Sequence, residues 1–209
     1  MYQLALTDEV HNTYIFSNTA PRKEDTKAQQ NNSGEKLMYA KLTNGFEIMA
    51  VNAGYCFSFV KPLITEYRMV HIANEGSQFR SRDIYPHAVA KMTANDESIK
   101  GNAVSTDTIP DYPKHVVASI DGYGNIKTTT RRSDLAYTPG QDITITLNGM
   151  AHQAVFTDGS FHVAEGVLAF APGSTGHDDR FMEIFYRGQS AQKLFNHPLV
   201  ESTFSLEEA

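Results

Sequence analysis

Apolar residues in the first half of the chain occur in short runs that are separated by polar stretches. The runs YQLALT, LMYAKL, FEIMAV and YRMVHIA have the length and composition typical of buried strands. Asn44-Gly45 lies between the second and third runs and predicts a β-hairpin, because this dipeptide suits a tight two-residue turn. Residues 18–36 show no apolar period and are rich in Asn, Gln and Lys, which predicts a mobile loop.

One segment of this half has a helical period instead. Between Arg82 and Met92 the apolar residues recur at the spacing of one helix face: Ile84, Ala88, Val89 and Met92. Pro86 falls in the first turn of this segment, where its missing N–H has no partner to lose. The run YCFSFV is compatible with a further strand or with the start of a helix.

The pattern changes after Ile109, where IPDYPK carries two prolines and predicts a domain junction. The runs HVVASI, NIKTTT, DITITL, MAHQAVF, EGVLAFA and FMEIFY follow at short intervals, with glycine-containing turns between many of them. Such spacing is typical of a small barrel or sandwich. SAQKLFNH predicts one short helix. We therefore expect an α/β amino-terminal domain over residues 1–110 and an all-β, barrel-like domain over residues 111–209.

Composition narrows the class of protein. The 209 residues are 41% hydrophobic and 20% charged, as in an ordinary globular protein, and the formal net charge is −6. Without a basic stripe, neither nucleic acid nor an acidic membrane is an expected partner. Cys56 is the single cysteine and its neighbours are aromatic, so we interpret it as a buried filler. One cysteine and no apolar leader segment favour a cytoplasmic protein.

Motifs for metal and cofactor chemistry are weak. His177-Asp178-Asp179 is the one compact cluster of metal-ligating residue types, and a solvated loop explains it better than a metal site. The sequence PGSTG lacks the GxSxG spacing of a nucleophile elbow, and DGYGN lacks a dinucleotide fingerprint. We therefore expect neither a metal nor a bound cofactor.

Three other stretches carry candidate site residues. In IDGYGNIKTT, Asp121 and Asn125 flank Gly-Tyr-Gly, a pattern that suits a plain hairpin turn or a turn that presents a ligand-binding carboxylate. In APGSTGHDDRFMEIFYRGQSA, a Gly/Ser loop precedes an apolar strand. In SQFRSRDIYPHA, two arginines, a serine and an aspartate interrupt an apolar run, and charges there need partners or water.

Taken together, these stretches resemble the S-adenosylmethionine hydroxide adenosyltransferase family, whose relatives include the fluorinase and chlorinase. The Asp121–Asn125 turn resembles the family's Asp-x-Phe-Gly-Asn turn. GSTG, FMEIFY and RGQSAQKL resemble its Gly-Ser-Ser-Gly loop, LEIA strand and Gly-Ser-Ala-Ala helix. FRSRDIYPHAVA resembles its Phe-His-Gly-Arg-Asp helix entry, VNAG its Pro-Asp-Asn-Gly, and Thr7-Asp8 its opening Thr-Asp.

The resemblance implies a fold, an assembly and an activity. Family members join an α/β amino domain to a β-barrel carboxyl domain and form homotrimers, with substrate between domains of neighbouring subunits. They cleave S-adenosylmethionine, the expected small-molecule ligand here, to adenosine and methionine. By this analogy Asp121 and Asn125 grip methionine and Tyr123 offers an aromatic face. The adenine would lie near Ser174, Thr175 and Arg180, and the ribose hydroxyls near Asp8.

The sequence also departs from the family pattern. The family's catalytic His is replaced by Arg80, whose guanidinium cannot accept a proton from water, and its catalytic Asp and Arg have no counterpart. Asn52 replaces the carboxylate of Pro-Asp-Asn-Gly. Ser81 lies where the fluorinase has a halide-binding Ser, and Arg80 with Ser81 forms the candidate catalytic pair. Arg82 and Asp83 are expected to form an ion pair or a helix cap.

Three hypotheses stay open at this stage. They are an active S-adenosylmethionine-cleaving enzyme with rearranged catalytic groups, a non-catalytic binder of S-adenosylmethionine or adenosine, and a structural family member.

Overall fold

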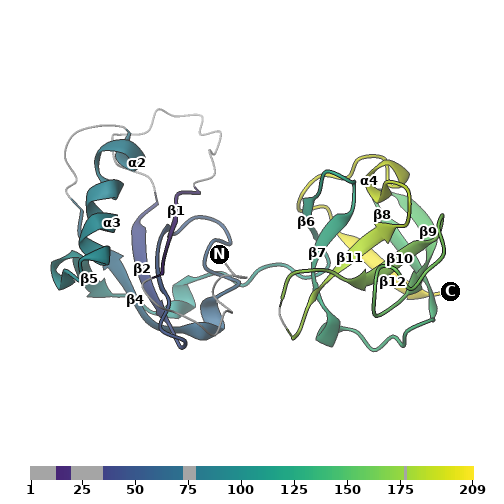
Figure 1. Ribbon diagram of the computed structural model, residues 1–209, viewed down its shortest axis with the longest axis horizontal. Coiled ribbons are helices and arrows are strands. Elements are labelled where there is room, and N and C mark those ends of the chain that lie inside the picture. Colours follow the sequence, from purple (N-terminus) through teal and green to yellow (C-terminus); the bar gives the residue numbers. More distant parts are fainter. Residues whose placement is uncertain (1–12, 20–34, 73–78, 177) are drawn as a thin grey trace. The chain divides into compact units, whose positions relative to one another are not determined.

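The computed structural model describes residues 13–19, 35–72, 79–176 and 178–209. The chain divides into two compact units, residues 1–112 and 113–209, and each contains one curled β-sheet (Figure 1). The sequence placed the junction two residues earlier, at the start of the proline-rich segment. Both units are mostly β, and helices are few and short.

The amino-terminal unit contains a five-stranded sheet in the order β1-β3-β2-β4-β5. Its strands are β1 (Tyr14–Ser17), β2 (Leu37–Leu42), β3 (Glu47–Val51), β4 (Ile64–Val70) and β5 (Lys100–Ala103). Strands β1 and β3 are parallel, and every other neighbouring pair in this sheet is antiparallel.

The hairpin expected at Asn44-Gly45 is present. The Gly45 amide donates to the Leu42 carbonyl at 2.9 Å, and the Leu42 amide donates to the Phe46 carbonyl at 2.8 Å, which closes β2 against β3. The loop spans residues 43–45, with Gly45 at a φ of +88°, and is one residue longer than the predicted two-residue turn. Tight turns produce antiparallel pairs, whereas parallel pairs need long crossovers that are usually helical. The expected α/β alternation is therefore not what this unit shows, because its described strands are joined mainly by turns and short 3-10 helices.

Both faces of this sheet are covered. Along β2, Leu37 and Tyr39 point to one apolar cluster, whereas Met38 and Ala40 point to the other, following the period of two. Helix α3 (Tyr85–Thr93) packs on the first face through Tyr85, Ala88 and Met92. The segment that contains Phe57 and Val60 packs on the second face.

The helix predicted between Arg82 and Met92 is present in two pieces, α2 (Arg80–Asp83) and α3, with the break at Ile84. Pro86 lies in the first turn of α3, as expected. Three 3-10 helices complete the unit: η1 (Lys61–Leu63), η2 (Glu97–Ile99) and η3 (Thr106–Thr108).

Several expectations have other outcomes. The run YCFSFV forms consecutive turns rather than a strand or a regular helix, and Cys56 there is half-buried. The strand expected over residues 2–7 and most of the loop expected over residues 18–36 lie outside the described residues. Strands β1 and β5 were not predicted, because they are short and lack a clear apolar alternation.

The carboxyl-terminal unit contains a seven-stranded sheet in the order β12-β8-β9-β10-β11-β7-β6. The strands are β6 (Val117–Ile120), β7 (Ile126–Arg131), β8 (Asp142–Leu147), β9 (Met150–Phe156), β10 (Leu168–Pro172), β11 (Phe181–Tyr186) and β12 (Phe204–Glu208). Among the described strands of this unit, β9 and β10 are the one parallel pair. Short elements η4 (Arg132–Asp134) and α4 (Ala191–Leu194) lie at its ends.

The core of this unit follows from strand alternation. In β8, Ile143, Ile145 and Leu147 are buried, while the threonines between them are half-buried. The sheet curls far enough that its two outer strands approach each other, because an isolated bridge joins Val116, just before β6, to Thr203, just before β12. The six predicted strand runs and the short helix are all found here, and only β12 was missed.

Candidate functional site

The Asp121–Asn125 turn between β6 and β7 is built around one carboxylate. Oδ1 of Asp121 accepts the backbone amides of Tyr123 and Asn125 at 2.9 and 3.0 Å, and Oδ2 accepts the Asn125 side-chain amide at 2.9 Å. This is the turn that the residue types predict. The Asp121 carboxylate therefore holds the loop in shape before it can contact any ligand.

The start of helix α4 packs directly against this turn. Gly124 has a φ of +85°, and a Cβ at this position would lie 2.0 Å from Oγ of Ser190. The Gln192 amide donates to the Gly124 carbonyl at 2.9 Å, and Ser190 caps the helix by accepting the Lys193 amide at 3.2 Å. Glycine at 124 thus allows the two segments to touch.

A buried ion pair links the turn to the Gly/Ser loop. Nζ of Lys127, on β7, lies 2.5 Å from the Glu183 carboxylate on β11 and 3.7 Å from Oδ2 of Asp121. Glu183 is 5% exposed and also accepts the Ser174 amide at 3.3 Å. A Cβ on Gly173 would lie 1.8 Å from Glu183 Oε1, so only glycine leaves room for this carboxylate.

The loop that follows Gly173 is held at its far end by Asp179. Its carboxylate accepts the Ser133 amide at 3.0 Å and the Ser133 hydroxyl at 2.8 Å, and Nη1 of Arg131 lies 3.7 Å from it. Within the loop, the Thr175 carbonyl accepts the Phe181 amide at 2.8 Å. The Ser174 amide and the Thr175 carbonyl are therefore committed to the loop itself, while the Arg180 side chain is exposed.

These contacts define a surface that we call the turn–loop site: Asp121, Tyr123, Asn125, Lys127, Ser174 and Glu183. Burial raises the pKa of Asp121, but hydrogen bonds from Asn125 and Tyr123 outweigh it and lower the pKa below its ordinary value. Asp121 is thus an anion at neutral pH. A carboxylate offers about four acceptor positions. Three of them accept hydrogen bonds within the turn, and Nζ of Lys127 lies 3.7 Å from Oδ2, so a cationic ligand group would share Oδ2 with Lys127.

The turn leaves one polar group and one aromatic ring available to a ligand. The Asn125 side-chain amide nitrogen donates to Asp121, which leaves its oxygen as an acceptor. The Tyr123 ring is 85% exposed and has no structural task in the turn beyond its backbone amide. Together they offer an acceptor and a flat apolar face beside a negative charge, which suits a ligand with an ammonium group and a planar or apolar part.

The candidate residues of the amino-terminal unit lie apart from this set in the sequence and are described within their own unit. Arg82 pairs with Asp83 through contacts of 2.5 and 2.9 Å, which confirms the expected ion pair. Arg80 Cζ lies 5.8 Å from the Tyr85 ring centroid, and Ser81 is exposed. The Asn52 backbone amide donates to the Lys36 carbonyl at 2.9 Å. Asp8 lies outside the described residues.

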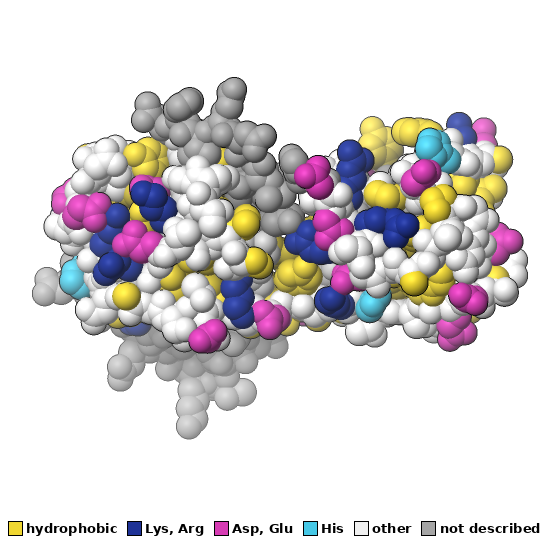
Figure 2. All heavy atoms as spheres, turned by 90° about the horizontal axis from the view of Figure 1, so that it is seen from below, with side chains coloured by type: hydrophobic (Ala, Val, Ile, Leu, Met, Phe, Trp, Pro, Cys, Tyr) yellow, Lys and Arg dark blue, Asp and Glu magenta, His cyan; other side chains and the backbone are white. Residues whose placement is uncertain are grey.

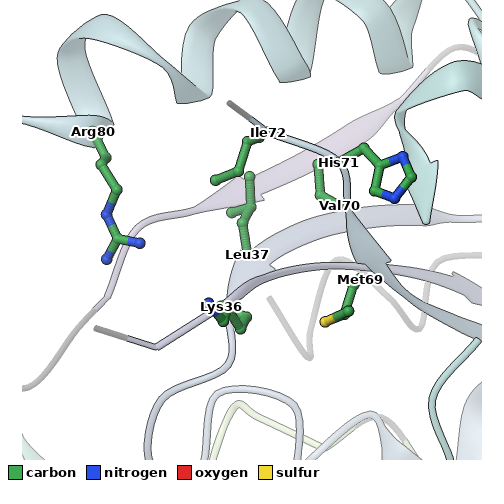
Figure 3. Close-up of a pocket in the computed structure, with 7 residues that line it drawn as sticks. All are labelled: Lys36, Leu37, Met69, Val70, His71, Ile72 and Arg80. Carbon is green, nitrogen blue, oxygen red and sulfur yellow. The ribbon is translucent and has the colours of Figure 1, made fainter. Parts of the chain in front are cut away.

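A cavity of about 210 Å³ occurs beside Arg80 in this unit. It is lined by Lys36, Leu37, Met69, Val70, His71, Ile72 and Arg80 (Figure 3). Arg80 extends from α2 at one end, His71 lies at the other end, and aliphatic side chains lie between them (Figure 3). The sequence pointed to Arg80 but not to the other cationic residues of this lining.

Other classes of site have little support in the described ranges. No group of three His, Cys, Asp or Glu residues within them is placed to hold a metal ion, and His177 of the expected loop cluster is not described. No helix in the described part of the chain has the length and apolar character needed to cross a membrane. Acidic and basic side chains are interspersed on the visible face of each unit (Figure 2).

Lys127 and Glu183 are the members of the turn–loop site that the sequence analysis did not name. Glu183 is the one charged residue in the apolar strand FMEIFY, which is a detectable signal for a buried charge that needs a partner. Lys127 lies in IKTTT and pairs with it across neighbouring strands β7 and β11, in register. That pairing depends on strand order, which the sequence alone does not supply.

Comparisons with known proteins bear on the fold. No protein-family model matches the chain, and no curated protein matches its sequence. A crystal structure of an uncharacterized conserved protein from Thermotoga maritima is similar, with 17% identity and a TM-score of 0.68 over 83% of this chain and 71% of that chain. A conserved hypothetical protein from Thermus thermophilus is also similar, with 16% identity and a TM-score of 0.63 over 94% of this chain and 74% of that chain. At such identities the likeness shows a shared fold alone.

Proposed function

We propose that this protein binds S-adenosylmethionine and cleaves it to adenosine and methionine, with catalytic groups that differ from those of the hydroxide adenosyltransferase family. The observation that carries the proposal is the turn–loop site. Three stretches that resemble the family separately in sequence, namely the Asp121–Asn125 turn, the Gly173–Gly176 loop and the helix after Ser190, are joined by one chain of contacts.

The chemistry of the ligand fits the groups that this surface leaves open. The methionine ammonium of S-adenosylmethionine would approach the Asp121 carboxylate and the Asn125 side-chain oxygen. The exposed Tyr123 ring would cover a flat or apolar part of the ligand. Because the backbone groups of Ser174 and Thr175 are used within the loop, we expect adenine to be held more by shape and by Arg180 than by these atoms.

In the cleavage step, water attacks the ribose C5′ carbon and the C5′–S bond breaks. The bonding electron pair stays on sulfur, which becomes a neutral thioether, so methionine leaves without an acid. The water loses one proton to a base. Alignment of the water with the C–S bond supplies most of the catalysis in such a displacement.

A second function, binding without cleavage, is favoured by one observation. The residue at the family's catalytic His position is Arg80, and a guanidinium stays protonated at any working pH. Arg80 and Ser81 can hold an anion or orient a polar group, but Arg80 cannot act as the base. If no other residue takes the proton, the protein is a binder of S-adenosylmethionine or adenosine.

The test uses the full chain. Calorimetric titration with S-adenosylmethionine and with adenosine measures binding, and chromatography of a long incubation detects adenosine. We expect Tyr123→Ala to weaken binding about tenfold without changing the fold, because base–aromatic stacking contributes about 1–3 kcal/mol and the ring is exposed. Phe161→Ala, which removes another exposed ring of the same unit, is the matched control. No heat with either ligand would refute both functions, and heat without adenosine would leave the binder.

The assembly and the finer architecture belong to the same proposal. A barrel-like carboxyl-terminal unit is supported by the bridge between Val116 and Thr203 at the two ends of the sheet. A homotrimer in the cytoplasm follows from the resemblance and from the single cysteine. Light scattering measures the molar mass of the purified protein and so tests the trimer. A monomer mass at micromolar concentration would contradict the trimer.

A further inference from the structure

The cavity beside Arg80 combines an apolar floor with a cationic rim. Leu37 and Val70 are buried and lie at the ends of neighbouring strands β2 and β4, while Met69 and Ile72 are half-buried. Figure 3 shows these aliphatic side chains between Arg80 at one end and the His71 ring at the other. The cavity is therefore apolar along its length and can be cationic where it meets solvent.

Arg80 and Lys36, the two basic side chains of the rim, have no acidic partner among the residues that the structure describes. Arg82, two positions along α2, is neutralised by Asp83 at 2.5 Å. Arg80 instead lies against the Tyr85 ring, and Lys36 forms no side-chain ion pair with any described residue. Burial raises the pKa of Tyr85, Arg80 lowers it and Glu35 raises it, so one described carboxylate also acts on this region. Among the described residues that line the cavity, the charged side chains are those of Lys36 and Arg80.

We propose that this cavity binds a small aliphatic monocarboxylate, with the carboxylate on Arg80 and Lys36 and the chain over Leu37, Val70 and Ile72. The planar guanidinium matches a carboxylate through two parallel hydrogen bonds, and the apolar floor requires a hydrocarbon tail. The volume of about 210 Å³ is below the ~300–1,000 Å³ of pockets for drug-sized ligands, so the tail is short. No residue of this cavity belongs to the turn–loop site, and the test of the cavity needs no nucleoside.

The first experiment compares an acid with its neutral isostere on the unmodified chain. Amide resonances of ¹⁵N-labelled protein are followed while 4-methylpentanoate or 4-methylpentanamide is added. We expect the acid to shift resonances of Leu37, Val70 and Ile72 in a saturable way, and to bind at least about tenfold more tightly than the amide, because hydrogen bonds to charged groups are the strong ones. Equal affinities, or shifts confined to other residues, would overturn the proposal.

Variants then test which basic side chains bind the carboxylate. Arg80→Gln and Lys36→Gln should each weaken binding of 4-methylpentanoate by about tenfold, while Arg82→Gln, on the same short helix, should leave it unchanged. Inorganic phosphate is titrated in parallel, because an anion site in which the apolar floor contributes nothing to affinity would bind phosphate more tightly than the acid. Tighter binding of phosphate than of the acid, or an equal effect of Arg82→Gln and Arg80→Gln, would refute the assignment.

Discussion

Lys127→Met should destabilise the carboxyl-terminal unit by leaving Glu183 buried without a positive partner. The Glu183 side chain is 7% exposed and that of Lys127 is 25% exposed, with their charged atoms 2.5 Å apart. Removing one partner of a buried ion pair costs about 3–5 kcal/mol, because the other charge stays desolvated and uncompensated. Since water reaches part of Lys127, we expect a loss below this range, about 2–3 kcal/mol.

A second substitution, Glu183→Gln, should change stability in opposite directions with and without Lys127. Glu183→Gln alone should cost only about 1 kcal/mol, because the amide keeps the shape and can still accept the Ser174 amide. In the Lys127→Met background the same change removes the unpaired charge, so there it should stabilise the unit. The two substitutions are therefore expected to be strongly non-additive.

The measurement must follow the carboxyl-terminal unit by itself, because the chain has two compact units. Urea unfolding monitored through the amide resonances of Ile184 and Ile145 does this, and both residues are fully buried in this unit. In a unit of this size, 2–3 kcal/mol corresponds to a lowering of Tm by about 10–20 °C. Lys193→Met, at an exposed lysine of the same unit that forms no ion pair with described residues, is the control.

Two outcomes would refute this reasoning. A cost below about 0.5 kcal/mol for Lys127→Met would place the pair among solvent-screened surface ion pairs. A destabilising effect of Glu183→Gln in the Lys127→Met background would show that the carboxylate is not held at a desolvation cost.

Further predictions concern the turn. Burial raises the pKa of Asp121, but its hydrogen bonds with Asn125 lower the pKa overall in the folded protein. The ionised carboxylate therefore stabilises the fold above its unfolded pKa, and this stabilisation is lost as pH falls through the folded pKa. Asp121→Asn should therefore reduce the loss of stability in acid unfolding curves below pH ~4, and an unchanged acid limb would contradict the assigned pKa direction. Gly124→Ala should cost about 2 kcal/mol or more in urea unfolding, because of its positive φ and the contact with Ser190, whereas Gly122→Ala, with open space around its Cβ, should be nearly neutral. Ser190→Ala should cost about 1 kcal/mol through loss of the helix cap, and an unchanged urea midpoint would refute that role.

The elements that the sequence predicted well are those whose cause is local. Asn44-Gly45 specifies a turn through its own backbone preferences, and the period of two in Ile143, Ile145 and Leu147 marks a buried face. The same holds for the Asp121 turn, since its side chain bonds to backbone only two and four residues away. Neighbouring residues suffice for such features.

The α/β expectation for the amino-terminal unit was wrong because strand direction is not a local property. The apolar runs near Leu37, Phe46 and Tyr67 suit buried strands in either a parallel or an antiparallel sheet. The connections decide between them, and here the described connections contain one α-helical stretch, after β4.

Residue order was enough to specify the turn at Asp121 and most strands of the carboxyl-terminal unit. The folded chain was needed to show that Lys127 and Glu183 join the turn to the Gly173 loop, and that Lys36 and Arg80 border one cavity. The difference lies in distance along the chain. Turns and strand faces follow from neighbours, whereas an ion pair between β7 and β11 exists only once strand order and register bring those side chains together.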